Sequence, residues 1–283
     1  EAFNEIERIE SQLSLYRPGS EIAQVNARAA SEAVRVSPEV FDLLATCQTY
    51  SAATEGAFDI TVAPLVRCWG FMKGSGEKPS EEQIERARQV VGIHLLDLDA
   101  RARTVRFQRP GMMLDLGSIG KGHALDAAAE IVRESGVTNA LLHGGTSTIR
   151  AVGPDPENGQ WKIAIELPAR EAGAEAELLS VASLDHQSLS VSAVWGKHFV
   201  IDGQSYGHVI DPRTGWPARD ALLGAVLAES AAMSDALSTG VLLGDQGLLD
   251  RLRTCFPAVE FLQAREDVRV FHGLKSAKRV SGS

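Results

Sequence analysis

The sequence predicts an α+β fold in which mixed, largely antiparallel sheets pack against helices. Two patterns support this. The first third of the chain has apolar residues at helical spacing behind helix-start signals, whereas the middle and the end are rich in short strand-like runs. Helices and strands do not alternate strictly along the chain, as a doubly wound parallel sheet would require. The chain has no fixed-period repeat.

Helix-start signals divide the first third. Ser20 is predicted to cap a short helix, and Ser37 followed by Pro38 starts a longer one, because Ser is a favoured cap and Pro is favoured at the first helical position. Ser80, followed by two glutamates, starts another helix after a loop. The predicted helices of this part cover 1–14, 20–26, 38–54 and a segment that begins at Ser80.

Strand patterns dominate the remainder. Short runs rich in Val, Ile and Leu are separated by Gly, Pro, Asp and Ser, which is typical of strands joined by turns. Strands are predicted at 95–99, 104–108, 112–116, 140–143, 148–152, 161–167, 178–183, 189–194, 198–202 and 221–228, with two more near the end of the chain. Helices are predicted at 120–135, 232–243 and 246–255.

Composition limits the class of protein. The 283 residues are 44% hydrophobic and 23% charged, which is typical of a globular chain and excludes wholesale disorder. The net charge of −9 argues against a non-specific nucleic-acid binder, which needs a basic surface. Cys47, Cys68 and Cys255 form no closely spaced pair, so neither a disulfide framework nor a CxxC zinc site is expected.

The length predicts one domain over residues 1–265, or two intimate lobes, one helical and one β-rich. Residues 275–283 are expected to form a loose tail. The chain begins without Met, inside an amphipathic helical pattern, so we expect that its natural start, with any targeting signal, lies upstream. No apolar run approaches the roughly 18 residues of a membrane span.

The segment from Asp115 to Gly122 lies between a predicted strand and a predicted helix. Its glycines allow close approach of a ligand to the backbone, and the helix start offers free N–H groups to an anion. The glycine spacing fits neither the P-loop nor the dinucleotide-binding fingerprint. The segment therefore indicates either a phosphate site or a tight turn in which Lys121 is simply solvated.

The segment Ser234-Asp235-Ala236-Leu237-Ser238-Thr239 offers oxygen ligands. In a helix, Asp235 and Thr239 lie on one face, and a carboxylate with a hydroxyl suits Mg²⁺. The alternative is that Ser234 caps the helix and Asp235 interacts with the helix dipole.

His208 stands in the segment 206–215, where Asp-Pro-x-x-Gly predicts a turn. A lone histidine is either a hydrogen-bonded structural residue or a base that titrates near neutral pH. In the segment 56–61, Phe58 and Asp59 contribute one wall of a ring-binding site, or Gly56 simply stops a helix and Asp59 caps the next turn.

The order of these segments is more specific than any one of them. They are Ser14–Arg17 with Ser20–Ile22, Gly56–Thr61 with Trp69–Phe71, Asp115–Gly122 with Asp126, Gly144-Gly145, His208–Gly215 and Asp235–Thr239. In this order and combination, the segments resemble those of the ApbE family, the FAD:protein FMN transferases. The resemblance spans roughly residues 3–262 and implies an ApbE-like α+β domain.

The resemblance implies an enzyme that transfers FMN from FAD to a Ser or Thr hydroxyl of a target protein through a phosphoester bond, with Mg²⁺ required and AMP released. Carried over position by position, the metal site comprises Ser118, Asp235, Ser238 and Thr239, and Asp235 is a catalytic residue. We expect His208 to be the catalytic base for the acceptor hydroxyl, because it lies beside the matched flavin-binding stretch. The implied FAD-binding residues are Tyr16, Ala57, Phe58, Asp59, Asp115, Lys121, His208 and Val209.

Two segments depart from the family pattern, and both are expected to lie near the flavin or the acceptor. Thr146 stands where the family usually has Asn after Gly-Gly, and the chain reads Val191-Ser192-Ala193-Val194-Trp195 where the family commonly has Ser/Thr-Ser-Gly. The alternatives to a transferase are an FAD pyrophosphatase that uses water as acceptor and a non-catalytic FAD-binding protein.

The family resemblance also suggests partners and a compartment. The implied partners are FAD and an acceptor protein with a Ser or Thr flavinylation site, such as a membrane redox subunit, and no nucleic acid is expected. Many relatives are exported, membrane-anchored periplasmic lipoproteins, but the segment that would specify export is absent from this chain.

Overall fold

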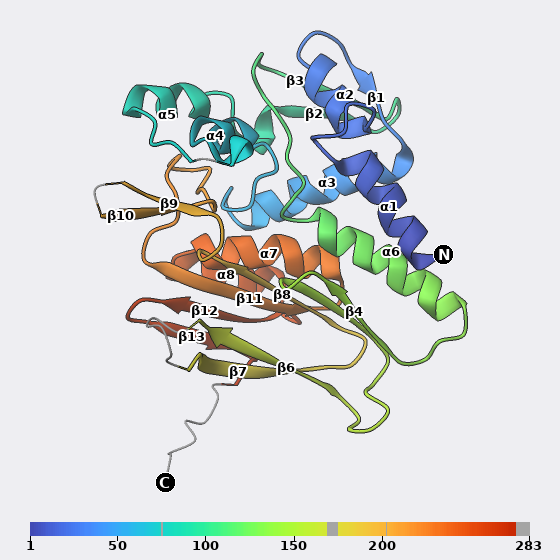
Figure 1. The fold of residues 1–283 in the computed structure, drawn as a ribbon. Coiled ribbons are helices and arrows are strands. Elements are labelled where there is room, and N and C mark those ends of the chain that lie inside the picture. Colours follow the sequence, from blue (N-terminus) through green and yellow to red (C-terminus); the bar gives the residue numbers. More distant parts are fainter. Residues whose placement is uncertain (75, 169–174, 202, 276–283) are drawn as a thin grey trace.

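The computed structural model describes residues 1–74, 76–168, 175–201 and 203–275. It is an α+β structure in which every pairing between named strands is antiparallel, so the predicted fold class is confirmed. Figure 1 shows most of the N-terminal helices in the upper part of the molecule and the largest sheet below them.

A six-stranded antiparallel sheet is the centre of the fold. Its strands lie in the order β13-β12-β11-β8-β5-β4. They are β4 (Ala140–Gly144), β5 (Thr148–Val152), β8 (Ser188–Ala193), β11 (Ala221–Ala228), β12 (Glu260–Arg265) and β13 (Arg269–His272).

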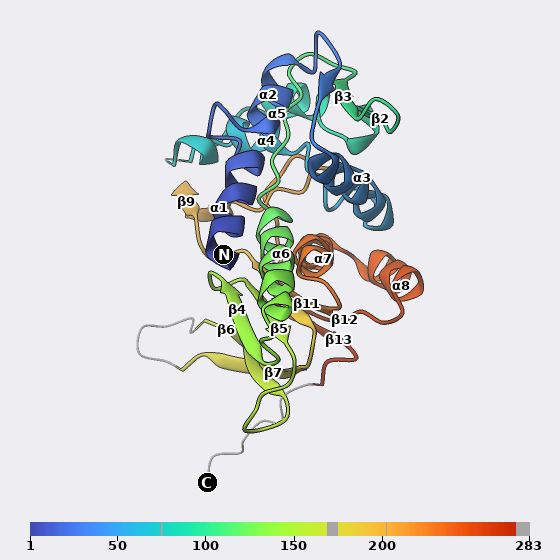
Figure 2. The ribbon, with the colours of Figure 1, turned by 90° about the vertical axis from the view of Figure 1, so that its right-hand side faces the viewer.

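Helices α6 (Gly120–Glu134), α7 (Ala231–Leu243) and α8 (Gln246–Cys255) lie between this sheet and the upper part, as Figure 2 shows from the side. Helix α7 packs on β8 and β11 and against α6. The two helices touch at Gly122, where an added Cβ would lie 2.0 Å from the Ala231 carbonyl oxygen. A glycine is therefore needed at this crossing.

The start of α7 is held from two sides. The Ser230 hydroxyl accepts a hydrogen bond from the Met233 N–H (3.0 Å), and the Asp126 carboxylate accepts from the N–H groups of Ala231 and Ala232 (2.8 and 2.9 Å). The alternative in which Ser234 caps this helix is therefore wrong, because the helix begins one turn earlier and its N–H groups already have acceptors.

A two-stranded sheet of β6 (Trp161–Leu167) and β7 (Glu177–Leu184) packs against the six-stranded sheet through an apolar cluster that includes Ile165, Leu184 and Leu223. A second small sheet joins β9 (His198–Ile201) to β10 (Gln204–Gly207). Both sheets lie close to the functional site described below.

The upper part contains helices, 3₁₀ turns and short strands. They are α1 (Ala2–Leu13), α2 (Glu21–Arg28), α3 (Pro38–Ala53), α4 (Ala63–Cys68), α5 (Glu81–Arg88), the 3₁₀ turns η1 (Phe71–Lys73) and η2 (Ile93–Leu95), and the strands β1 (Val34–Arg35), β2 (Leu96–Asp99) and β3 (Thr104–Phe107). One continuous apolar core joins this part to the C-terminal half, from Ile9 of α1 to Phe261 of β12.

The predicted strand at 112–116 is wrong. The Asn26 side chain accepts the Leu114 N–H (2.7 Å) and donates to the Leu114 carbonyl (3.0 Å), while Asp115 N–H donates to the Ile60 carbonyl (2.7 Å). These contacts satisfy the backbone of the segment without a neighbouring strand. The sequence patterns also do not predict β1, α4 or β10.

In the described ranges, no helix is both long and apolar enough to cross a bilayer. Of the predicted tail, residues 276–283 lie outside the part of the chain that the structure describes, as does Asp202 at the end of one predicted strand.

Candidate active site

A cavity of about 790 Å³ brings most of the predicted site residues together. Its wall is formed by the upper part, the start of α6, the middle of α7, the end of β8, the start of β11, and β6. The predicted residues on its wall are Tyr16, Ala57, Asp59, Asp115, Ser118, Lys121, His208, Val209, Asp235 and Thr239. Phe58 and Ser238 are buried behind the wall, and Phe58 packs in the main core.

Asp235 is the most heavily contacted acidic group of the cavity. Its carboxylate lies 3.1 and 3.2 Å from the Lys121 Nζ atom, and it accepts hydrogen bonds from the Gly122 N–H (3.1 Å) and the Thr148 hydroxyl (3.3 Å). The residue is 4% exposed, so an unpaired charge here would be costly. The lysine, the N–H group at the helix start and the hydroxyl together satisfy this carboxylate.

A hydroxyl cluster continues from Asp235 along α7. The Ser192 Oγ atom of β8 lies 2.8 Å from Ser238 Oγ and 3.2 Å from Thr239 Oγ1. Ser238 in turn donates to the Asp235 carbonyl (2.8 Å). Sequence reasoning did not single out Ser192 as a partner of the α7 hydroxyls, although Ser188, Ser190 and Ser192 share one face of β8.

The donors around Asp235 fit a hard divalent cation. Asp235, Thr239 and Ser118 line the cavity and provide a carboxylate, a hydroxyl and hydroxyl or carbonyl oxygens, the ligands that Mg²⁺ prefers. In the described residues there is no group of three or more His, Cys, Asp or Glu side chains that could hold a metal ion. A cation here would therefore have one carboxylate ligand and take its other ligands from neutral oxygens and water.

Asp59, which is buried, and Asp115, which is partly buried, are two further carboxylates of the cavity wall. Burial raises the pKa of Asp115, and the hydrogen bond from Gly117 N–H (2.8 Å) and the charge of Lys121 oppose that shift. Burial also raises the pKa of Asp59, against hydrogen bonds from Thr61 and from Ile93 N–H. The hydrogen bonds of Asp59 connect the loop after α3 to η2, so this side chain helps to fix the shape of the cavity wall.

Tyr16 stands at the mouth of the cavity with 69% of its surface exposed. Partial burial and the nearby charge of Asp115 raise the pKa of its hydroxyl. The hydroxyl therefore stays protonated at neutral pH, and the exposed ring is free to cover a planar ligand.

His208 has a defined tautomer. Its Nδ1 atom lies 3.2 Å from the Lys197 carbonyl oxygen, which can only accept, so Nδ1 carries the proton and the lone pair is on Nε2. Burial lowers the pKa of His208, although the bond to Lys197 opposes the shift. The imidazole is therefore neutral at neutral pH, the state that a general base needs.

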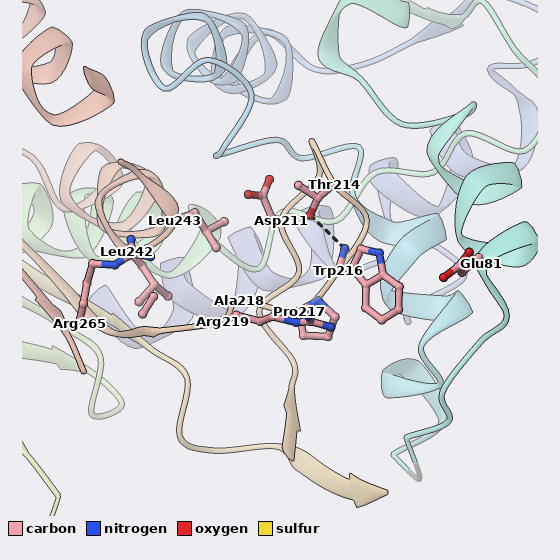
Figure 3. Close-up of a pocket in the computed structure, with 11 residues that line it drawn as sticks. Glu81, Asp211, Thr214, Trp216, Pro217, Ala218, Arg219, Leu242, Leu243 and Arg265 are labelled. Carbon is pink, nitrogen blue, oxygen red and sulfur yellow. Dashed lines mark hydrogen bonds between the residues drawn. The ribbon is translucent and has the colours of Figure 1, made fainter. Parts of the chain in front are cut away.

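The loop after His208 separates two cavities. His208, Val209, Ile210 and Pro212 face the cavity described above. Figure 3 shows the other side, where Asp211, Thr214 and Trp216 contribute to a second cavity of about 540 Å³. The loop is rigidly attached, because Arg213 pairs with Asp211 (2.7 Å) and donates to the Leu243 carbonyl at the end of α7 (2.9 Å).

The profile of the ApbE family matches residues 1–256. The chain belongs to the ApbE family. The predicted family, and with it the prediction of a transferase, is thereby confirmed.

Curated relatives and solved structures agree with this assignment. A FAD:protein FMN transferase of Vibrio cholerae is 30% identical over 241 residues, which are 84% of this chain and 70% of the relative. One of Haemophilus influenzae is 31% identical over 249 residues, 86% of this chain and 71% of the relative. The crystal structure of the ApbE protein of Thermotoga maritima matches with a TM-score of 0.86 at 27% identity, covering 96% of this chain and 87% of that one. The crystal structure of the apo form of the Pseudomonas stutzeri flavinyl transferase ApbE matches with a TM-score of 0.79 at 30% identity, covering 98% of this chain and 86% of that one.

The departures from the ApbE pattern lie on the wall of the same cavity. Thr146, Ser192, Ala193 and Trp195 line it, whereas Val194 does not. They belong to the β4–β5 turn, the end of β8 and the segment that follows β8. Sequence reasoning missed the contribution of β6, which lines the cavity through three consecutive residues, 164–166.

Proposed function

We propose that the chain transfers FMN from FAD to a Ser or Thr hydroxyl of a target protein, releases AMP and requires Mg²⁺. The observation that supports this best is the composition of one cavity. It holds the Lys121–Asp235 pair and the Thr239 hydroxyl together with a neutral imidazole, His208, which has a free Nε2. The names of the relatives, FAD:protein FMN transferase, support the same choice.

In the proposed reaction the acceptor hydroxyl attacks the FMN-side phosphorus of FAD. A phosphoester bond forms, the pyrophosphate bond breaks, and AMP leaves with the bridging oxygen. The proton of the hydroxyl passes to His208 Nε2. Because a neutral alcohol is a weak nucleophile, removal of this proton in the transition state accelerates the attack.

Charge builds up on the phosphate oxygens during this step. Lys121 supplies a positive charge next to Asp235, and its Nζ atom also donates to the Gly117 carbonyl (3.0 Å), so the ammonium already lies beside the Asp235 carboxylate before FAD binds. A Mg²⁺ ion held by Asp235, Thr239 and Ser118 would neutralise phosphate charge when bound. The carboxylates of Asp59 and Asp115 shape the side that we assign to FAD.

The deciding experiment measures AMP release from FAD with the purified chain, with and without Mg²⁺, and with and without an acceptor. We expect Mg²⁺-dependent release that is fast only with an acceptor and leaves a product heavier by one FMN. Fast release without an acceptor would instead identify an FAD pyrophosphatase. Bound FAD without release under any condition would identify a flavin-binding protein.

Asp235→Ala tests the metal assignment in the same assay. We expect it to abolish the Mg²⁺-dependent part of AMP release. Unchanged release by this variant would refute the role of Asp235, whichever acceptor the enzyme uses.

A further inference from the structure

The β6 strand borders the reaction cavity through its backbone. The cavity wall includes Ala164, Ile165 and Glu166, three residues in succession. Because side chains of a strand alternate between its two faces, a cavity that lies over one face meets only every second residue. A cavity that meets three consecutive residues reaches the edge of the strand.

That edge has no partner strand in the described ranges. β6 pairs with β7 over its whole length, and the two form a sheet of their own. The register of the pair shifts between Ile165 and Glu166, because β7 has one extra residue, Leu179, between the partners of these two. The irregularity therefore belongs to β7, and β6 stays continuous where it lines the cavity.

The edge is held firmly in place. Ile165 and Leu167 are 1% and 5% exposed and pack with Leu223 and Leu189 of the six-stranded sheet. Ala164 and Glu166 face away from this core and are exposed. A segment that paired with β6 would therefore meet a rigid template.

The cavity next to this edge has apolar and small walls. Val191 and Ala193 of β8, Trp195 and Leu223 lie on the wall of the same cavity. None of them carries a charge that could bind a phosphate. Lys121, Asp235 and His208 lie on the wall of the same continuous cavity, so a hydroxyl on a segment at β6 has a path to the reacting phosphate.

We propose that the acceptor protein presents its Ser or Thr in an extended segment that pairs with the free edge of β6. This inference rests on the proposed function and adds how the acceptor is bound. Backbone pairing holds an extended segment with little regard for its side chains, while neighbouring pockets select among them. The acceptor is thus recognised by its backbone at β6 and delivers its hydroxyl toward His208.

The first test compares two substitutions on the exposed face of the β6–β7 sheet. Ala164→Trp fills the edge inside the cavity, whereas Val181→Trp places the same ring on β7, directly across the pair from Ala164 and outside the cavity wall. We expect Ala164→Trp to raise the KM for acceptor peptides by about tenfold or more, the equivalent of at least one backbone hydrogen bond. Its dissociation constant for FAD, measured by quenching of flavin fluorescence, and all values of Val181→Trp should stay unchanged.

The acceptor probes come from a randomised library of synthetic peptides of about ten residues, the length of a long strand, each with one central Thr. Mass spectrometry identifies those that gain FMN. If the library and whole candidate proteins gain none, the proposed function fails, and this inference fails with it. If Ala164→Trp weakens FAD and peptide binding equally, the β6 lobe holds FAD and the inference alone is overturned.

The second test uses the unaltered enzyme, so it does not depend on the folding of a variant. Each backbone amide of a reactive peptide is N-methylated in turn, which removes one N–H donor. In a paired strand the N–H groups of alternate residues point to the same neighbour. We expect strong inhibition at every second position around the Thr and little effect at the positions between. Uniform inhibition, or none, would contradict pairing with β6.

Discussion

The Asp235 carboxylate is buried and is surrounded by hydrogen-bond donors. It has contacts with an ammonium group, a backbone N–H and a hydroxyl, from α6 and from β5. Lys121 is 42% exposed and therefore able to move, whereas Gly122 and Thr148 are fixed by secondary structure. The carboxylate is thus held in place by fixed donors, and its most mobile partner is a cation.

For Asp235→Asn we expect the fold to persist and metal binding to weaken by about a hundredfold or more, because the neutral amide keeps the shape but removes the only carboxylate we assign to the ion. Calorimetric titration with Mn²⁺ measures this. Asp245→Asn is the control, since Asp245 caps α8 away from the cavity. Equal metal affinity in the wild type and Asp235→Asn would place the ion elsewhere.

For His208 we expect a transfer rate that is constant above neutral pH and falls as the pH drops through a pKa below 6.5. The direction follows because burial favours the neutral base, and protonation removes the Nε2 lone pair. His208→Asn should lower transfer by about a hundredfold to ten-thousandfold and leave FAD binding intact.

His198→Asn is the matched control for this substitution. The Nδ1 atom of His198 also contacts a backbone carbonyl, that of Gly196 (2.9 Å), but His198 does not line the cavity. A low-pH limb that survives in His208→Asn would mean that another group is the base.

At the scale of elements, the loop between β10 and β11 connects three parts of the molecule. The Arg213 guanidinium contacts the end of α7, Arg88 of α5 donates to the Arg213 carbonyl (2.8 Å), and Trp69 after α4 donates to the Gly215 carbonyl (2.9 Å). His208 is the first residue of this loop. Its position relative to Asp235 on α7 therefore depends on these attachments.

Arg213→Lys should cost about 1–3 kcal/mol of unfolding free energy, because lysine cannot reproduce the bidentate pair with Asp211 and also reach Leu243. We expect transfer to fall further than FAD affinity, since the loop carries the base but only two, His208 and Val209, of the residues that we assign to FAD. Urea unfolding and a comparison of kcat with the FAD dissociation constant measure the two effects. A drop in FAD affinity alone would argue against this role.

Gly122→Ala should destabilise the protein by about 1–3 kcal/mol or more, because the new methyl group overlaps the Ala231 carbonyl and forces α6 away from α7. Gly19→Ala is the control, since nothing lies within 4 Å of the position of its Cβ. Thermal unfolding of both variants gives the comparison. An unchanged melting temperature for Gly122→Ala would show that the helices tolerate a wider spacing.

At the scale of the whole molecule, one apolar core joins distant parts of the chain. It includes Ile9 and Leu44 from the N-terminal helices together with Leu237 of α7 and Phe261 of β12. A second cluster around Trp69 and Tyr206 links α4 to the β9–β10 hairpin (ring centroids 5.4 Å apart). The two lobes that the sequence leaves as an alternative share these cores.

We therefore expect a single cooperative unfolding transition in differential scanning calorimetry, with equal calorimetric and van't Hoff enthalpies. This tests the prediction of one domain over residues 1–265. Two resolved transitions would instead support separate lobes.

Local sequence signals predict much of this architecture. Ser37-Pro38 and Ser80 start α3 and α5 where expected, and the aliphatic runs of β5 and β11 are strands. The strand expected at 112–116 fails because Asn26, 88 residues away from Leu114 in the chain, supplies its hydrogen bonds. Local patterns contain no information about such a partner.

The sequence by itself determined the fold class, most helices and strands, the family, and the residue types of the site, because capping, periodicity and the order of motifs are local properties of the chain. Only the tertiary structure decided which of these residues meet. It brings Lys121 into contact with Asp235, 114 residues away in the sequence, and Ser192 into contact with Thr239, 47 residues away. It also places the edge of β6 on the cavity wall. Such contacts depend on how elements pack, and packing is set by the whole set of buried side chains at once.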